Sequence, residues 1–282
     1  MTNTATGHIA GTSIVITGAG GGFGRLGAQK AAALGAKVTC GDIDLAAAEA
    51  VVEGITADGG TAQAATVDVR DLAAVKALIA KALDTYGALD VMINNAGIMP
   101  LAFFSDHEAA YPAWERCIDI NIKGVLNGMV AAYDPMIAAG RGQIVNLSSI
   151  YGNFPVIGAA VYGASKSAVN FLSESLRVES RGKIKVTTIK PTGVPTTGLS
   201  GTVINPAAGV GIVAHNMPEF MDMVGQMGAG TFPAQRLSPD AMDYASLAPD
   251  HIADAVIHVI NQPWGVSISE MTVRAAGDHF VL

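Results

Sequence analysis

A glycine-rich turn between an apolar run and a helical pattern most constrains the fold of this 282-residue chain. The apolar residues 14–16 predict a buried strand, and the pattern over residues 25–34 predicts a helix. Between them lie Gly18, Gly22 and Gly24, in a turn where a Cβ atom would block close approach to the backbone. A strand, a glycine turn and a helix together place backbone N–H groups where a pyrophosphate can bind.

An acidic residue follows the glycine turn at the distance that a dinucleotide site requires. A second strand, predicted at residues 37–40, leads to Asp42, which lies 20 residues after Gly22. A carboxylate about 20 positions beyond the glycines accepts hydrogen bonds from the adenosine ribose hydroxyls. The sequence therefore predicts a bound dinucleotide.

Strands and helices alternate along the chain, which favours a parallel sheet with right-handed crossovers. The predicted strands lie at residues 14–16, 37–40, 62–69, 90–94, 143–147, 185–190 and 271–274. The predicted helices lie at residues 25–34, 45–57, 72–85, 113–139, 160–180 and 249–261. Pro135 should kink or restart the longest helix, because proline removes a backbone donor. We expect a single α/β domain, a doubly wound Rossmann fold of about seven strands with helices on both faces.

Tyr162 and Lys166 stand four residues apart in the string Y-G-A-S-K, on one face of a predicted helix. A phenol ionises near pH ~10, and a nearby ammonium group favours the phenolate and lowers that pKa. Ser149 lies thirteen residues before Tyr162 and could hold the oxygen of an alcohol or carbonyl beside the phenol. Ser148 competes for this role, because neighbouring side chains on a strand point in opposite directions. The group is suited to proton exchange with a C–OH/C=O couple.

These motifs occur together in an order that resembles one family. In chain order they are T-G-x-x-x-G-x-G from Thr17 to Gly24, Asp68-Val69, N-N-A-G from Asn94 to Gly97, Asn121, Ser149, Tyr162, Lys166 and Pro191. Over roughly residues 10–200 the chain resembles the short-chain dehydrogenases/reductases, which are Rossmann-fold, NAD(P)-dependent oxidoreductases. It departs from the family at Thr192, where glycine is usual, and the glycine follows one position late at Gly193.

The resemblance implies a role for each matched position. Tyr162 would be the general acid/base, Ser149 would orient the substrate oxygen, and Lys166 would hold the nicotinamide ribose and lower the tyrosine pKa. Asn121 would support a water relay behind the lysine, although a purely structural role in a long helix is the alternative. The expected cofactor-binding residues are Gly18, Gly21, Gly22, Phe23, Gly24, Asp42, Ile43, Asp68, Val69, Asn95, Ala96, Gly97, Tyr162, Lys166, Pro191, Val194 and Thr196.

The expected cofactor is NAD rather than NADP. The charge of Asp42 would repel a 2′-phosphate, and Gly21 occupies a position where NADP-using members of the family tend to carry a basic side chain. Arg25 could reach a phosphate, but a first-turn arginine on a solvated helix face is the simpler interpretation.

Composition excludes several other classes of function. Lysine and arginine number 17 against 24 acidic residues, which argues against nucleic acid or an anionic membrane as partner. Cys40 and Cys117 lie far apart in no paired motif, which suits a reducing cytoplasm and gives no metal or disulfide framework. Apolar stretches are too short for a membrane span, and residues 1–10 are expected to form a flexible tail.

Residues 197–249 form an insert rich in glycine, proline and methionine. Long segments without periodicity inside a compact domain are often lids or binding loops, and methionine adapts to irregular apolar shapes. We expect a substrate-covering lid here. The alternative is that the methionines pack a local helix or a subunit contact. Residues 98–104 and 151–156 are further candidates for the pocket wall.

The sequence thus predicts an NAD(H)-dependent alcohol dehydrogenase or carbonyl reductase that interconverts an apolar or cyclic secondary alcohol and a ketone. A non-catalytic NAD-binding regulator and an NAD-dependent epimerase or dehydratase are the alternatives. The resemblance also implies a homo-oligomer, a tetramer or dimer, paired through the long helix and the catalytic helix. Small residues on the long helix would allow close helix approach or serve internal packing: Gly124, Gly128, Ala131 and Ala132.

Overall fold

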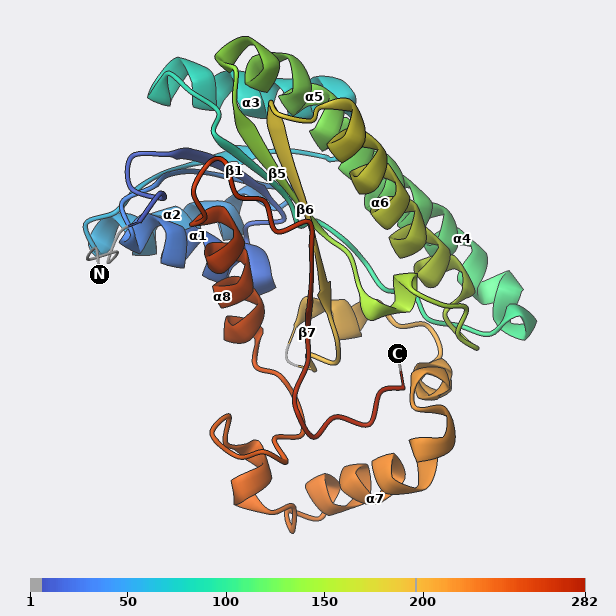
Figure 1. Cartoon of the computed structure of the whole chain (residues 1–282). Helices are drawn as coiled ribbons and strands as arrows, with labels where there is room; N and C mark the ends of the chain where they lie inside the picture. Colours follow the sequence, from blue (N-terminus) through green and yellow to red (C-terminus); the bar gives the residue numbers. More distant parts are fainter. Residues whose placement is uncertain (1–6, 196, 282) are drawn as a thin grey trace.

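The computed structural model describes residues 7–195 and 197–281, and Figure 1 shows their arrangement. Seven parallel strands form one sheet in the order β3-β2-β1-β4-β5-β6-β7. The strands are β1 (Ser13–Thr17), β2 (Lys37–Asp42), β3 (Thr61–Thr66), β4 (Val91–Asn94), β5 (Gly142–Leu147), β6 (Ile184–Pro191) and β7 (Glu270–Val273). The strand order reverses between β1 and β4, which makes their carboxyl ends the topological switch point. The doubly wound fold is confirmed.

Helices cover both faces of this sheet (Figure 1). The helices are α1 (Gly22–Ala33), α2 (Leu45–Ala57), α3 (Leu72–Tyr86), α4 (His107–Cys117), α5 (Gly124–Ala139), α6 (Ala160–Glu179), α7 (Met217–Gly228) and α8 (Pro249–Ile260). The largest core cluster contains residues of α1, α2 and α8, and a second contains residues of α3, α5 and α6. Each face of the sheet therefore has its own helical layer.

The alternation of side chains along β1 explains why its sequence is apolar throughout. Ile14 and Ile16 belong to the core cluster of α1, α2 and α8, whereas Val15 belongs to the cluster of α3, α5 and α6. Successive side chains on a strand point to opposite faces, and both faces are covered. A continuous apolar run is the expected sequence of such a strand.

Two predicted boundaries were wrong, and the predicted restart at Pro135 does not occur. The long helical stretch begins at His107 instead of residue 113 and contains a π-helical segment, Ile118–Lys123, between α4 and α5. α5 continues through Pro135 without restarting. The third strand ends at Thr66, short of residue 69.

Two further expectations are resolved by packing. Residues 7–10 are not a loose tail, because Ile9 is buried in the core and the His8 N–H donates to Asn261 Oδ1 at 2.7 Å; residues 1–6 lie outside the described residues. The small residues of α5 serve internal packing. A Cβ atom on Gly124 would come within 2.8 Å of Val69 Cγ2, and Gly128 packs against the Asn94 side chain.

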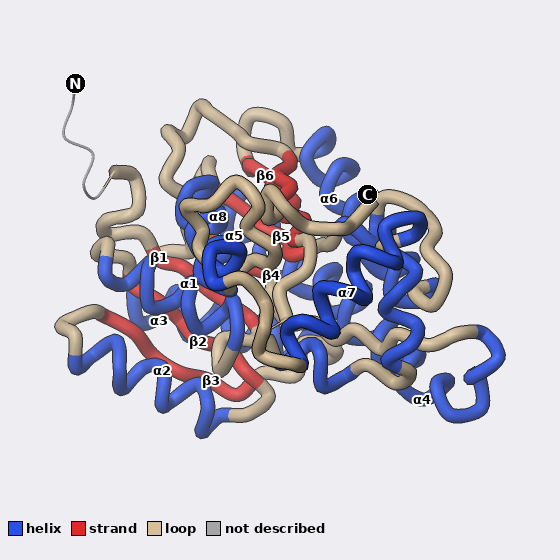
Figure 2. Tube along the Cα trace, turned by 90° about the horizontal axis from the view of Figure 1, so that it is seen from below, coloured by secondary structure: helices blue, strands red, loops and turns tan. Residues whose placement is uncertain are grey.

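The insert lies across the carboxyl ends of the strands, and Figures 1 and 2 show α7 outside the two helical layers. Besides α7 it contains short 3-10 turns at Gly198–Thr202, Pro206–Ile212, Ala214–Asn216 and Ala234–Leu237. After β7 the chain returns toward α7, where it ends (Figure 1). Among the described residues, no helix combines the length and the hydropathy needed to cross a membrane.

Candidate active site

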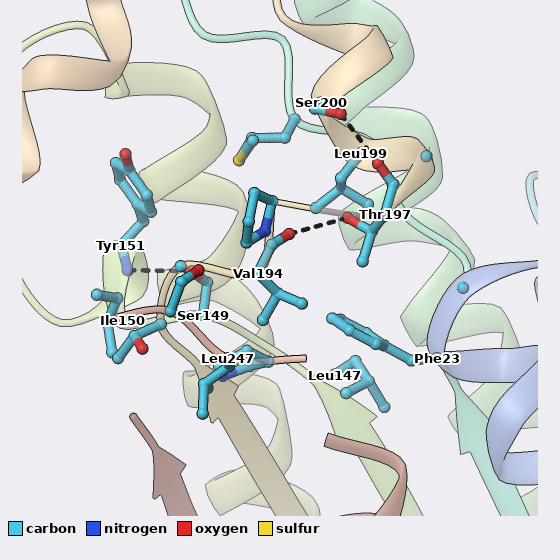
Figure 3. A pocket seen from close by; sticks show the side chains of 18 of the residues that line it. Phe23, Leu147, Ser149, Ile150, Tyr151, Val194, Thr197, Leu199, Ser200 and Leu247 are labelled. Carbon is cyan, nitrogen blue, oxygen red and sulfur yellow. Dashed lines mark hydrogen bonds between the residues drawn. The ribbon is translucent and has the colours of Figure 1, made fainter. Parts of the chain in front are cut away.

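A cavity of about 870 Å³ opens at the carboxyl ends of the strands. The glycine turn, the ends of β4 and β5, α6, the segment after β6, α7 and the C-terminal segment all contribute to its wall. Figure 3 shows Ser149, Ile150 and Tyr151 on one side, with Phe23 and Leu147 on the other. The size and the mostly apolar lining are those of a ligand site.

Hydrogen bonds fix the glycine turn to the end of β4. Thr17 Oγ1 accepts from the N–H groups of Asn95 and Ala96 at 3.1 and 3.3 Å. Asn95 Nδ2 donates to the carbonyls of Thr17 and Gly18, each at 2.9 Å. Gly18 has a φ of +66°, and a Cβ atom on Gly24 would overlap the Gly18 carbonyl. This backbone path therefore requires glycine at both positions.

The turn also leaves a stretch of backbone open to the cavity. Gly21 and Gly22 line the cavity, and a Cβ atom built on either residue would meet no heavy atom within 4 Å. α1 begins at Gly22, so its free N–H groups lie at this opening. The chain therefore presents a space where a pyrophosphate group can approach a helix N-terminus.

Asp42 is held at the end of β2 with its carboxylate oriented by the backbone. Its Oδ2 atom accepts from the Gly20 N–H at 2.8 Å and its Oδ1 atom from the Asp44 N–H at 3.0 Å. Asp42 lines the cavity. Arg25 is exposed and donates to Gln29 Oε1 at 3.4 Å on its own helix. The local geometry therefore assigns Arg25 to a helix-surface contact.

Tyr162 and Ser149 meet in the wall of the cavity. Tyr162 is 3% exposed, and this burial raises the pKa of its phenol, while a hydrogen bond with Ser149 opposes the rise. Ser149 Oγ also accepts from the Tyr151 N–H at 3.2 Å, and the Tyr151 ring lies edge-on to Tyr162 with centroids 5.5 Å apart. The Ser148 hydroxyl instead donates to the Lys166 carbonyl at 3.2 Å. Of the two serines, Ser149 is the one whose hydroxyl lowers the pKa of the Tyr162 phenol against the effect of burial.

Lys166 lies one helical turn from Tyr162, as the spacing predicted. Its Nζ atom donates to the Leu147 carbonyl at 2.8 Å and lies 5.8 Å from the centroid of the Tyr162 ring. Burial lowers the pKa of Lys166 to about 8. The expected lowering of the Tyr162 pKa by Lys166 was wrong for this structure, because burial of the phenol dominates and the ammonium is directed at a carbonyl.

Asn121 lies in the π-helical segment, fully buried, with its amide engaged by the backbone. Its Oδ1 atom accepts from the Ile98 N–H and its Nδ2 atom donates to the Ile98 carbonyl, both at 2.9 Å. Nδ2 also lies 3.1 Å from Ser165 Oγ, which donates to the Tyr162 carbonyl at 2.7 Å. Asn121 thus ties the cavity-lining segment at Ile98 to the helix that carries Tyr162 and Lys166.

The cavity gathers most of the residues predicted to bind a cofactor. Those that line it are Gly18, Gly21, Gly22, Phe23, Asp42, Asn95, Ala96, Gly97, Tyr162, Lys166, Pro191 and Val194. Gly24, Ile43, Asp68 and Val69 do not line it, and Thr196 lies outside the described residues.

Local contacts account for two of the exceptions. Asp68 receives hydrogen bonds from Arg70 Nε at 2.9 Å and Nη2 at 2.6 Å, and the guanidinium holds the pKa of the Asp68 carboxyl below its ordinary value. The Val69 carbonyl accepts from Asn127 Nδ2 at 2.8 Å. Both residues therefore have structural contacts of their own, between β3 and the neighbouring helices.

Sequence reasoning missed the contribution of the C-terminal segment. Phe280 and His279 line the cavity, together with residues 244–248 that precede α8. A Cβ atom on Gly193 would overlap the Phe280 ring, so this contact explains why glycine stands one position after Thr192. Residues 275–281 show no periodicity in the sequence, and only their long-range packing reveals them.

Known proteins resemble this chain in sequence and in architecture. The family described as short chain dehydrogenase matches residues 12–205. An uncharacterized oxidoreductase of Listeria monocytogenes is 35% identical over 92% of this chain and 94% of its own length. The 2,5-dichloro-2,5-cyclohexadiene-1,4-diol dehydrogenase LinX of Sphingobium indicum is 36% identical over 67% of this chain and 75% of its own length. A metagenomic short-chain oxidoreductase, solved in complex with NADP, superimposes with a TM-score of 0.71 at 28% identity, covering 95% of this chain and 98% of that one. The chain therefore belongs to the short-chain dehydrogenase/reductase family of oxidoreductases.

Proposed function

We propose that the protein is an NAD(H)-dependent dehydrogenase that interconverts an apolar or cyclic secondary alcohol and the corresponding ketone. The observation that carries the proposal is the meeting of Tyr162, Ser149 and Lys166 in the wall of one cavity, which extends to the glycine turn. A phenol for proton transfer and a site for a dinucleotide thus face the same space.

The cleft fits NAD in three places. The open backbone at Gly21 and Gly22 would hold the pyrophosphate, Asp42 would accept hydrogen bonds from the adenosine ribose, and Lys166 would hold the nicotinamide ribose. Gly18, Asn95, Ala96, Gly97, Pro191 and Val194 would line the rest of the cofactor site, and Phe23 its entrance. NAD supplies a hydride acceptor when bound.

Asp42 supports NAD over NADP, although the metagenomic relative holds NADP. The Asp42 carboxylate is fixed by two backbone N–H groups, and a 2′-phosphate beside it would be repelled. The test is the ratio of kcat/KM for NAD and for NADP. A ratio that favours NADP would overturn the assignment.

Proton transfer would pass through Tyr162. During alcohol oxidation the Ser149 hydroxyl would donate to the substrate oxygen, and the substrate hydroxyl would donate to the Tyr162 phenolate, which would take its proton as the C–H hydride leaves for the bound dinucleotide. General acid–base help of this kind contributes about 10²–10⁴-fold to a rate. Asn121 would act as a positioning residue, because its amide fixes the backbone at Ile98 beside the cavity.

The substrate half of the cavity supports an apolar substrate. Its wall includes Tyr151, Leu199, Phe220, Met223 and Met227. Among the lining residues, the charged groups at neutral pH are Asp42 and Lys166, and both are expected to face the cofactor. LinX, by its name, acts on a chlorinated cyclic diol, which agrees with a cyclic secondary alcohol as substrate.

The insert would act as a lid over this substrate. α7 places Phe220, Met223 and Met227 in the cavity wall, while Met221 on the same helix is 53% exposed. Replacing Phe220 with alanine should therefore change substrate preference, measured as kcat/KM ratios between small and bulky alcohols. A change in melting temperature alone would contradict the lid.

Subunits would pair through exposed apolar side chains on the long helical stretch and α6, including Ile118, Leu126, Val130, Phe171 and Val178. Analytical ultracentrifugation of the purified protein tests this expectation. A monomer at micromolar concentration would contradict it.

Turnover of NAD on a panel of aliphatic, cyclic, aromatic and steroid alcohols tests the function. Wild-type protein should form NADH, and Tyr162→Phe should lower kcat by at least about 100-fold while NAD still binds. Tyr111→Phe, on an exposed side chain of α4, is the matched control. Tight NAD binding without turnover would favour a regulator, and turnover without net NADH release would favour an epimerase or dehydratase.

A further inference from the structure

His279 is the one imidazole among the described residues that line the cavity, and it comes from the C-terminal segment after β7. Its side chain is 9% exposed, yet Nδ1 is a buried atom without a hydrogen-bond partner in the described structure. A buried polar atom without a partner costs about 1–3 kcal/mol. Such atoms in native proteins call for an explanation, and a ligand is one.

The backbone around His279 is fixed on both sides. Asn216 Nδ2 donates to the His279 carbonyl at 3.0 Å, and the Val281 N–H donates to the Ile212 carbonyl at 3.1 Å. The imidazole packs edge-on against Phe220 of α7, with ring centroids 6.2 Å apart. Nδ1 has almost no accessible surface, so a ligand in the cavity can pair with it only after the imidazole ring turns about its Cβ–Cγ bond.

His279 belongs to the substrate half of the cavity. Phe220 and Phe280, its stacking partner and its chain neighbour, pack on the buried cluster of Ile150, Ile212 and Val213. Tyr151 packs on the same cluster, and its ring contacts the Tyr162 ring edge-on. An apolar wall thus leads from Tyr162 to His279, away from the β2 end where Asp42 lies.

We propose that His279 binds a second oxygen of the substrate, remote from the carbon that reacts at Tyr162. The substrate class would be a cyclic diol or hydroxyketone. This inference rests on the proposed function. A neutral imidazole has one donor and one acceptor nitrogen, and a hydroxyl group can pair with either. A carboxylate is disfavoured, because Lys166, the cation of the lining, already donates to the Leu147 carbonyl beside Tyr162.

The preference for a substrate with a second oxygen should be measurable as the ratio of kcat/KM for a diol to kcat/KM for cyclohexanol. A site with a buried polar group binds an analogue lacking its partner less well, because that group stays unpaired. Turning the ring so that Nδ1 pairs with a substrate oxygen would relieve about 1–3 kcal/mol, which corresponds to roughly 5–150-fold in kcat/KM. We expect at least one of the cyclohexane-1,2-, 1,3- and 1,4-diols to exceed cyclohexanol by about 10-fold or more.

The experiment compares kcat/KM for cyclohexanol with that for each diol by NADH formation. The proteins are wild type, His279→Phe, His279→Gln and the control His258→Phe, which replaces an exposed histidine of α8. Phenylalanine should bring the diol-to-cyclohexanol ratio near one, glutamine should retain part of it, and the control should keep the wild-type ratio. Melting temperatures of all four proteins establish that each is folded.

Two results would overturn the inference, and only the second would also contradict the proposed function. In the first, wild type and His279→Phe give the same ratio of kcat/KM for the diols to kcat/KM for cyclohexanol. In that case His279 binds no second substrate oxygen, and the proposed function stands. If wild type forms no NADH with cyclohexanol or any diol, the proposed reaction on cyclic alcohols is wrong, and the inference is lost with it.

Discussion

Replacing Lys166 with methionine should change how the stability of the fold depends on pH. The Lys166 side chain is 5% exposed, and burial lowers its pKa from 10.5 to about 8. One pKa unit corresponds to about 1.4 kcal/mol, so keeping this ammonium charged in the native state costs about 3 kcal/mol. Methionine fills a similar volume without charge and removes that cost.

Whether the free energy of unfolding rises or falls with pH depends on which state, native or unfolded, keeps the Lys166 proton. Below pH 8 the native and unfolded chains both carry the charge, so the full cost is present. Between pH 8 and pH 10.5 only the unfolded chain remains protonated at Lys166, so the stability of the wild type rises by about 1.4 kcal/mol per pH unit. Methionine leaves the Leu147 carbonyl without its donor, at about 1–3 kcal/mol. At pH 7 Lys166→Met should therefore equal or exceed the wild type by up to about 2 kcal/mol.

Urea unfolding at fixed protein concentration, from pH 6.5 to 9.5, gives the free energies of unfolding. The advantage of Lys166→Met should shrink by about 2 kcal/mol between pH 8 and pH 9.5. Both proteins carry Cys117→Ala, because burial raises the pKa of the Cys117 thiol, Lys166 opposes that rise, and the loss of Lys166 would shift that pKa. Taking the difference between the two proteins then cancels Cys40, whose thiol pKa is raised by burial in both. Lys76→Met, on an exposed position of α3, measures the loss of one surface lysine. A difference that stays constant with pH would refute the reasoning.

Three further predictions address the site. Because burial raises the pKa of Tyr162, initial rates of alcohol oxidation should rise from pH 7 to 10 as the phenolate fraction grows, whereas rates of ketone reduction should change little because the phenol stays protonated; a flat oxidation profile would contradict Tyr162 as base. Gly193→Ala places a Cβ atom in the Phe280 ring and should lower the free energy of unfolding by about 1–3 kcal/mol. Gly201→Ala, with open space around it, is the control, and equal melting temperatures by calorimetry would contradict the contact between Gly193 and Phe280. Asp42→Ala should raise the kcat/KM ratio of NADP to NAD by about 10-fold or more, and an unchanged ratio would remove Asp42 as the selecting group.

The parts of the site that the sequence predicted are those fixed by local geometry. Tyr162 and Lys166 share a helix face because they are four residues apart, and Gly18 and Gly22 have positive φ values that glycine tolerates. Asp42 ends a strand next to the turn. In each case the residue lies within one helix or strand or at its end, so the spacing and residue types in the sequence are enough to predict its position.

The parts that the sequence did not predict depend on long-range packing. The raised pKa of Tyr162 reflects how completely other segments bury it, and spacing to Lys166 says nothing about that burial. Phe280 reaches Gly193 only because the chain folds back after β7. The π-helical segment that places Asn121 against Ile98 inserts an irregularity into a helix whose sequence pattern looks continuous.

Three residues that line the cavity carry buried polar groups at a net cost. Lys166 is held charged out of water, and Thr192 and His279 each have a buried atom, Oγ1 and Nδ1, without a hydrogen-bond partner in the described structure. Each group weakens the fold, and sites that break local rules are where function is expected. A cofactor and substrate that supply the missing partners would recover part of this cost on binding. Binding should then stabilise the folded protein beyond what apolar contact alone provides, because ligands that satisfy the native state do not bind the unfolded chain in the same way.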